Sequence, residues 1–235
     1  MIKHGTEFDV PGKGLVFVHI PKVAGTSIEN ALGLDDPTET NYHKYTGWDP
    51  IYSIWMQHAT LSQIHEYWRS IVKDYFKFTF VRNPYDRAVS DWLWFKNDVS
   101  GSSKSFEHTT LKDYLLGRGS FKHIDEPRER ETYRADHFLS QSDFILKDVN
   151  NIFNIDFIGK FETIDQDWKT LMKRISKYTG VTFDIKLPHV NKSKSKKWRG
   201  EHYSTYYDDE TRDIATMRYG FDLKLFNYEF EENPS

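Results

Sequence analysis

The sequence predicts an α/β fold, in which helices flank a central, mostly parallel sheet in three layers. Two apolar runs rich in Val, Ile and Phe, Leu15–Ile20 and Phe76–Val81, are typical of buried strands. Each run is followed by a segment with helical signals, and strands that alternate with helices form parallel sheets covered on both faces. The length of 235 residues is comfortable for one domain, so we expect residues 1–235 to form it, with 1–13 as an extension.

Local patterns predict the helices. Thr26 can cap a helix that ends at Gly33, and Pro84 can open one that continues to about Phe95. Leu61–Val72 places apolar side chains on one face. Further helices are expected at 106–116, at 164–178 before Gly180, and through Ile214 and Met217.

Two further short strands are expected, at 143–146 and 155–158. The chain ends in an aromatic stretch that we expect to pack on the body of the protein, namely Phe221, Phe226, Tyr228 and Phe230.

Composition excludes several classes of protein. The 32 Lys and Arg against 35 Asp and Glu give a net charge of -3, which disfavours a globally basic nucleic-acid binder. Cysteine is absent, so disulfides, thiolate zinc sites, iron–sulfur clusters and cysteine nucleophiles are excluded. The polar start, Met1–Gly14, and the lack of a long apolar run predict no signal peptide, no membrane span and a cytoplasmic location. Nothing in the sequence indicates the oligomeric state.

The corner after the first strand has the composition of a phosphate-binding loop. It reads His19-Ile-Pro-Lys-Val-Ala-Gly-Thr-Ser27, with a glycine before two hydroxyl residues at the expected start of a helix. Backbone N–H groups and the helix dipole at such a point favour an anion. No lysine directly precedes Thr26, so this is not a Walker A loop; the lysine is Lys22. A plain βα turn with an exposed lysine is the alternative.

The corner after the second strand carries arginines. It reads Phe80-Val-Arg-Asn-Pro-Tyr-Asp-Arg-Ala-Val-Ser-Asp91. The planar fork of Arg82 can grip a phosphate at the strand end, and Ser90 can donate to the same anion. Arg87 is expected to have a structural role, as the partner of Asp86, Asp91 or another carboxylate. In a parallel sheet ligands bind beyond the carboxyl ends of the strands, so we expect the two corners to be neighbours.

Together the two corners resemble the sulfotransferases that use 3′-phosphoadenosine 5′-phosphosulfate (PAPS). The resemblance is strongest to the branch of heparan sulfate 2-O- and chondroitin 4-O-sulfotransferases. It implies a P-loop-like fold. Similarity continues in Ile158-Gly-Lys-Phe-Glu162, in Asp167 and Trp168, and in Leu187-Pro-His-Val-Asn-Lys-Ser193. The resemblance covers nearly the whole chain.

The resemblance implies roles for these residues. The backbone of Ala24, Gly25, Thr26 and Ser27, with the two hydroxyls, would hold the 5′-phosphate. Lys22 would stabilise the charge that grows on the leaving phosphate.

At the second corner, Arg82 and Ser90 would hold the 3′-phosphate. Lys192 and Ser193 would be further contacts with PAPS. They lie in a basic loop, 191–199, which is either a lid over the anion or a solvated segment; Trp198 could stack on adenine or a sugar, or only pin the loop.

The acceptor hydroxyl must lose a proton, and histidine is the usual base near neutral pH. His58 precedes the helix at Leu61, a place similar to that of a catalytic histidine in 2-O-sulfotransferases, and we expect it to be the base. His19 reads as a hydrogen-bonded core residue. Glu29 and Glu66 are alternative bases, although both look like solvated helix residues.

The expected function is therefore PAPS-dependent sulfuryl transfer to a hydroxyl-bearing acceptor, in particular a glycan. Lysine and arginine supply the positive charge, and no metal-ligand pattern is present, so no metal is expected. Two alternatives remain: a non-catalytic module that binds a nucleotide or a sulfated glycan, and a P-loop kinase that uses ATP.

Overall fold

The protein is described by a computed structural model. The structure describes residues 2–3, 13–33, 48–49, 54–97, 106–121, 135–148, 151–152, 155–188 and 201–233. These residues fall into two compact units. The first unit comes from Met1–Val81 and Gln141–Lys192, and the second from Arg82–Ser140 and Ser193–Ser235. Each unit is therefore built from two stretches that are separated in the sequence.

The first unit contains an open four-stranded sheet of order β1-β2-β5-β8. Strands β2 (Leu15–Val18), β5 (Phe76–Val81) and β8 (Phe157–Lys160) are parallel, and β1 (Ile2–Lys3) pairs antiparallel with β2. The predicted α/β fold with a mostly parallel sheet is confirmed. The strands that lead into the two chemically loaded corners are direct neighbours, since Val18 pairs with Thr79.

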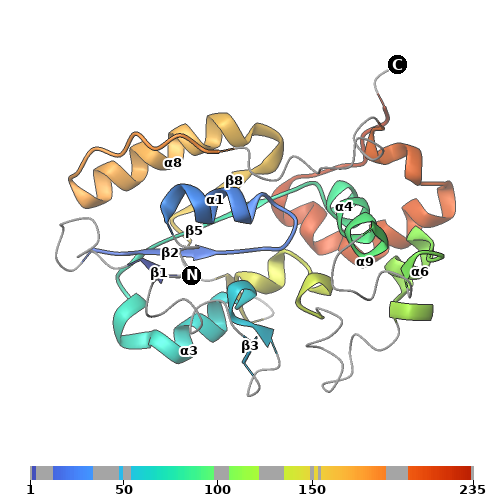
Figure 1. Cartoon of the computed structure of the whole chain (residues 1–235), viewed down its shortest axis with the longest axis horizontal. Coiled ribbons are helices and arrows are strands. Elements are labelled where there is room, and N and C mark those ends of the chain that lie inside the picture. The colour runs from blue at the N-terminus through green and yellow to red at the C-terminus, as the bar shows by residue number, and fades with distance from the viewer. Residues whose placement is uncertain are drawn as a thin grey trace. The chain divides into compact units, whose positions relative to one another are not determined.

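Helices cover both faces of this sheet. In Figure 1, α1 (Gly25–Leu32) and α8 (Ile164–Thr179) lie on one side of the strands and α3 (Leu61–Val72) lies on the other. Gly33 ends α1 and Gly180 ends α8, both with a positive φ, as their positions in the sequence predict.

Shorter elements complete the first unit. They are the paired strands β3 (Trp48–Asp49) and β4 (Ile54–Trp55), the paired strands β6 (Leu146–Asp148) and β7 (Asn151–Ile152), and the 3-10 helices η2 (Met56–His58), η5 (Ser142–Phe144) and η6 (Phe161–Thr163).

Two of the predicted strands lie at slightly different residues from those expected. The segment 143–146 begins as the 3-10 helix η5, because Ile145 N–H donates to the carbonyl of Ser142, and β6 starts only at Leu146. The strand expected at 155–158 is β8 at Phe157–Lys160. Short apolar runs carry too little periodicity to separate a strand from a helical turn.

Side chains from all three parallel strands fill the core of the first unit. The rings of Phe17 and Phe78 stack with centroids 5.1 Å apart, and the Thr79 hydroxyl donates to the carbonyl of Val18 at 2.8 Å. Gly159 allows β8 to approach β5 closely, since a Cβ there would lie 2.4 Å from the Phe80 ring. The buried hydroxyl of Thr79 is thus satisfied within the sheet.

The second unit is helical. It contains α4 (Pro84–Asn97), α6 (Leu111–Leu116) and α9 (Asp209–Phe226), with 3-10 helices η3 (Gly119–Phe121), η4 (Ala135–Phe138) and η8 (Tyr203–Tyr206). Its core is mainly aromatic, and its largest buried members are Tyr85, Trp92, Phe95, Phe106, Tyr114, Phe121, Tyr203 and Tyr219. Much of the 16% aromatic content of the chain is used here.

Two expectations for this unit were wrong in detail. The helix expected at 106–116 is interrupted: Phe106 is helical, 107–110 are not, and α6 begins at Leu111, where the Thr110 side chain accepts from Asp113 N–H and caps it. In the aromatic end, Phe226 and Tyr228 are buried, whereas Phe221 is 53% exposed on α9. Within the described ranges, every helix is too short or too polar to cross a membrane.

Candidate functional site

The backbone of the first corner is held in an unusual conformation. Between β2 and α1, Lys22 has φ 71° and Ala24 has φ 68°, in the left-handed region that residues with a side chain rarely adopt. Such strain concentrates at ligand clamps, and left-handed residues that alternate with ordinary ones turn successive N–H groups toward one anion. The corner predicted to bind phosphate thus has the backbone of an anion cradle.

The start of α1 differs from the prediction in its cap. Ala24, not Thr26, is the N-cap, and its carbonyl accepts from the N–H groups of Ser27 at 3.0 Å and Ile28 at 3.2 Å. The helix therefore starts at Gly25, earlier than predicted, and Thr26 lies inside its first turn. That turn contains no acidic side chain, which leaves the positive end of the helix dipole favourable to an anion.

Gly25 brings the loop directly against His19. A Cβ on Gly25 would lie 1.8 Å from the Nε2 atom of His19, a distance that no side chain can adopt. The imidazole therefore forms the floor beneath the first residue of α1, and only glycine permits this approach.

His19 is a buried, hydrogen-bonded histidine, as predicted. Its Nδ1 lies 2.5 Å from Oε1 of Glu29, and the two side chains are 5% and 2% exposed. The expectation that Glu29 is solvated was wrong, because its side of α1 faces this histidine. Glu66 is exposed on α3, as expected.

The Glu29 carboxyl is stabilised in its charged form. Burial raises its pKa, but the charge and hydrogen bond of His19 and a hydrogen bond from Gln57 outweigh burial, so the pKa lies below the ordinary 4.5. An ionised carboxylate can only accept, so Nδ1 of His19 donates to it.

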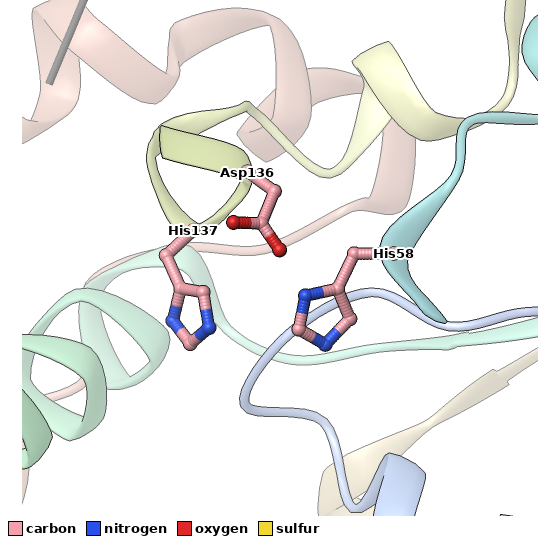
Figure 2. Close-up of side chains that lie close together, drawn as sticks. All are labelled: His58, Asp136 and His137. Atoms are coloured by element: carbon pink, nitrogen blue, oxygen red, sulfur yellow. The ribbon is translucent and has the colours of Figure 1, made fainter. Parts of the chain in front are cut away.

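His58, the predicted base, lies in the 3-10 helix η2 and is buried (Figure 2). Its ring stands edge-on to the ring of His19, with centroids 4.7 Å apart. Directly after it, Thr60 caps α3: its hydroxyl accepts from Gln63 N–H, and the Gln63 side chain accepts from Thr60 N–H. This reciprocal cap fixes where the chain turns beyond His58.

The second corner opens α4 at Pro84, as predicted. Arg82 lies at the end of β5, where Nε donates to Oδ2 of Asp86 at 2.7 Å, and this ion pair orients the guanidinium. Asn83 Oδ1 accepts from Tyr85 N–H and fixes the first turn of α4. Ser90 lies two turns further along the helix and is half-buried.

Arg87 has a structural position, in which it donates hydrogen bonds to backbone carbonyls. It is buried, and the carbonyls are those of His137 and Leu139. Next to it, the buried carboxylate of Asp91 accepts from the Tyr114 hydroxyl at 2.9 Å and pairs with Nδ1 of His137 at 2.6 Å. Burial raises the pKa of Tyr114 well above its ordinary value, so the phenol stays protonated and donates.

The pairing of Asp91 and His137 is not predicted by the sequence. His137 and its neighbour Asp136 lie on η4 (Figure 2). The one available signal was an acid at Asp91 in a row of apolar residues on α4, because a buried carboxylate requires donors.

Two of the later residues that resemble the family, Asp167 and Trp168, make contacts that join segments of the first unit. Asp167 accepts from Lys160 N–H and from the Thr163 hydroxyl, and so joins the end of β8 to α8. The Trp168 indole donates to the carbonyl of Ile185 at 2.7 Å. Lys192, Ser193, Trp198 and the basic loop 191–199 lie outside the described residues, as does most of the extension 1–13.

Comparison with known proteins agrees with these features. A sequence model described as the sulfotransferase family matches residues 8–229, nearly the whole chain. No curated protein matches the chain. The matched range includes both corners, β8 and α9. The chain therefore belongs to the sulfotransferase family, whose members transfer sulfuryl groups.

Proposed function

We propose that the protein transfers the sulfuryl group of PAPS to a hydroxyl group of a carbohydrate. The observation that carries the proposal is the cradle at the first corner, where Lys22 and Ala24 adopt left-handed backbone conformations directly before α1. Membership of the sulfotransferase family supports the phosphosulfate group of PAPS as the anion that this cradle would bind.

The loop supplies the contacts for the 5′-phosphosulfate end of the donor. The backbone of Ala24 and Gly25, with Thr26 and Ser27, holds the phosphate at the positive end of α1. Lys22 stands in the same loop and supplies a charge that a phosphate leaving group requires. The absence of acidic side chains from the first turn of α1 supports this role.

The second corner supplies the contacts for the 3′-phosphate. Arg82 offers a guanidinium that Asp86 already orients, and Ser90 lies two turns along the same helix. This contact would separate PAPS from ordinary adenine nucleotides. By their resemblance to the corresponding loop of the family, Lys192 and Ser193 are further contacts with PAPS.

The reaction requires one base and one positive charge. The oxygen of the acceptor hydroxyl forms a bond to sulfur while the bond from sulfur to the bridging phosphate oxygen breaks. His58 accepts the hydroxyl proton, and Lys22 stabilises the negative charge on the departing 3′,5′-bisphosphoadenosine (PAP). Atoms and charge balance in this scheme without a metal.

Radiolabelled PAPS tests the proposal directly. The purified protein is incubated with PAPS labelled in the sulfuryl group and with polysaccharide and oligosaccharide acceptors. We expect label in one class of glycan and release of PAP. Binding of PAP without transfer to any hydroxyl acceptor would instead identify a binding module. Phosphate transfer from ATP, with no use of PAPS, would identify a kinase.

A further inference from the structure

The carboxylate of Glu29 lies at the centre of a buried polar network in the first unit. It is 2% exposed on α1 and makes three hydrogen-bond contacts with two side chains from other segments. His19 Nδ1 donates to Oε1 at 2.5 Å, and Gln57 Nε2 donates to Oε2 at 3.0 Å and to Oε1 at 3.3 Å. Both carboxylate oxygens are therefore engaged, and Glu29 is placed to organise its neighbours rather than to reach an acceptor.

One arm of the network leads to the phosphate cradle. The His19 ring is held by Glu29 at Nδ1, while its Nε2 faces Gly25, the first residue of α1. Phe17 stacks on the other side of the ring at 5.5 Å. The ring occupies the space that a Cβ on Gly25 would need, so a shift of the imidazole toward the loop would press on Gly25. Glu29 thereby fixes the floor of the cradle.

The second arm leads to His58. Gln57 is the residue directly before it and donates to Glu29, while the His58 ring contacts the edge of the His19 ring at 4.7 Å. The base is thus approached from two sides by groups that Glu29 holds. The titratable groups that face Glu29 in this network are His19 and His58.

We propose that Glu29 is a positioning residue for sulfuryl transfer, which acts through His19 on the cradle at Gly25 and through Gln57 and His19 on the base His58. The proposal rests on the proposed function. A buried ion pair adds little net stability compared with apolar side chains of the same volume. The pair instead orients its neighbours, since each of its hydrogen bonds holds in position one group that the reaction needs. Misplacement of such groups by about 1 Å costs roughly a hundredfold in rate.

The test separates the two arms with two variants. Glu29→Gln removes the charge and keeps the shape, so both arms loosen; we expect kcat to fall about a hundredfold and the affinity for PAP to fall about tenfold. Gln57→Leu releases only the arm to His58, so we expect a lower kcat with an unchanged Kd for PAP. Glu210→Gln, on the exposed face of α9, is the matched control and should leave both quantities unchanged.

Circular dichroism and titration with PAP, below the Tm of each variant, confirm that the fold is intact. If Glu29→Gln does not fold, Gln57→Leu still tests the arm to His58. Folded variants that keep the wild-type kcat would overturn the inference. The inference would also be overturned if kcat fell only in proportion to the fraction of each variant that is folded. Absence of transfer by the wild-type protein would instead refute the proposed function, which is measured first.

Discussion

The backbone at Lys22 and Ala24 adopts a conformation that residues with a Cβ normally avoid. Each such residue costs of the order of 1–3 kcal/mol, so the surrounding structure has to enforce it. Here Gly25 packs against His19, and the carbonyl of Ala24 receives the first helical hydrogen bonds of α1. These contacts hold the loop in its conformation, so under the proposed function it needs little rearrangement to bind the donor phosphate.

Replacement of Lys22 tests its action on the leaving group. We expect Lys22→Ala to lower kcat about a hundredfold or more, with a smaller effect on the Kd for PAP, because the charge matters most when the bond to phosphate breaks. Steady-state kinetics and a titration with PAP measure the two quantities. Lys169→Ala, on the exposed surface of α8, is the control. Equal losses in both quantities for Lys22→Ala would contradict the role.

Arg82 can be tested without loss of its charge. Arg82→Lys keeps the positive charge but removes the planar fork, so we expect the preference for PAP over 5′-AMP to fall about tenfold. Calorimetric titration with the two nucleotides measures this preference. Arg212→Lys on α9 is a matched change at an arginine that is not part of the second corner. An unchanged preference in Arg82→Lys would show that the 3′-phosphate is bound elsewhere.

The Glu29–His19 pair also predicts a pH dependence of stability. The pKa of Glu29 in the folded protein lies below the ordinary 4.5, so folding favours the ionised form. Its stabilisation is complete above that ordinary value and is lost as the pH falls through the folded pKa. Urea unfolding should therefore show a gap between wild type and Glu29→Gln that shrinks from about pH 6 to about pH 3. A gap that is constant over this range would argue against an ionised Glu29.

At the scale of elements, hydrogen bonds at the ends of helices and strands place the site. The reciprocal cap of Thr60 and Gln63 starts α3 directly after His58. Asp167 joins α8 to the end of β8, and Asn83 starts α4 beside Arg82. Asp167, a family-like residue beyond the two corners, thus secures the ends of two elements.

The cap of α3 gives a prediction at this scale. Thr60→Ala leaves the Gln63 N–H without its acceptor, so we expect a loss of about 1 kcal/mol in the free energy of unfolding. For a chain of this size that lowers the Tm by roughly 2–4 °C. Thr170→Ala, inside the exposed face of α8, should not destabilise, since alanine has the higher helix propensity. Thermal unfolding of both variants decides whether the cap contributes as expected.

At the scale of the whole molecule, PAP, the nucleotide part of the donor, should stabilise the folded protein. PAP at a hundred times its Kd adds about 2.7 kcal/mol by mass action. For this chain length we expect a rise in Tm of roughly 5–10 °C. 5′-AMP at the same concentration should give a smaller rise, because it lacks the 3′-phosphate. Equal rises with both nucleotides would contradict the proposed role of Arg82.

Sequence patterns determined the parts of this protein that depend on neighbouring residues. The runs Leu15–Ile20 and Phe76–Val81, the bounds of the helix at Leu61–Val72 and the glycine stops at Gly33 and Gly180 were all readable. Both corners could be identified because a strand, a loop and a helix follow one another within a few residues. The family resemblance depended on the same short stretches.

Only the tertiary structure decided which polar groups are buried together. Glu29 looked solvated from its helix, but α1 turns it toward His19 and Gln57, 28 residues further on. Asp91 likewise meets His137 and Tyr114, which lie far away in the sequence. Such pairs leave no local periodicity, because the energy that fixes them comes from partners brought together by the fold. The same is true of the left-handed backbone at Ala24, which tertiary contacts around Gly25 hold against the local preference of alanine.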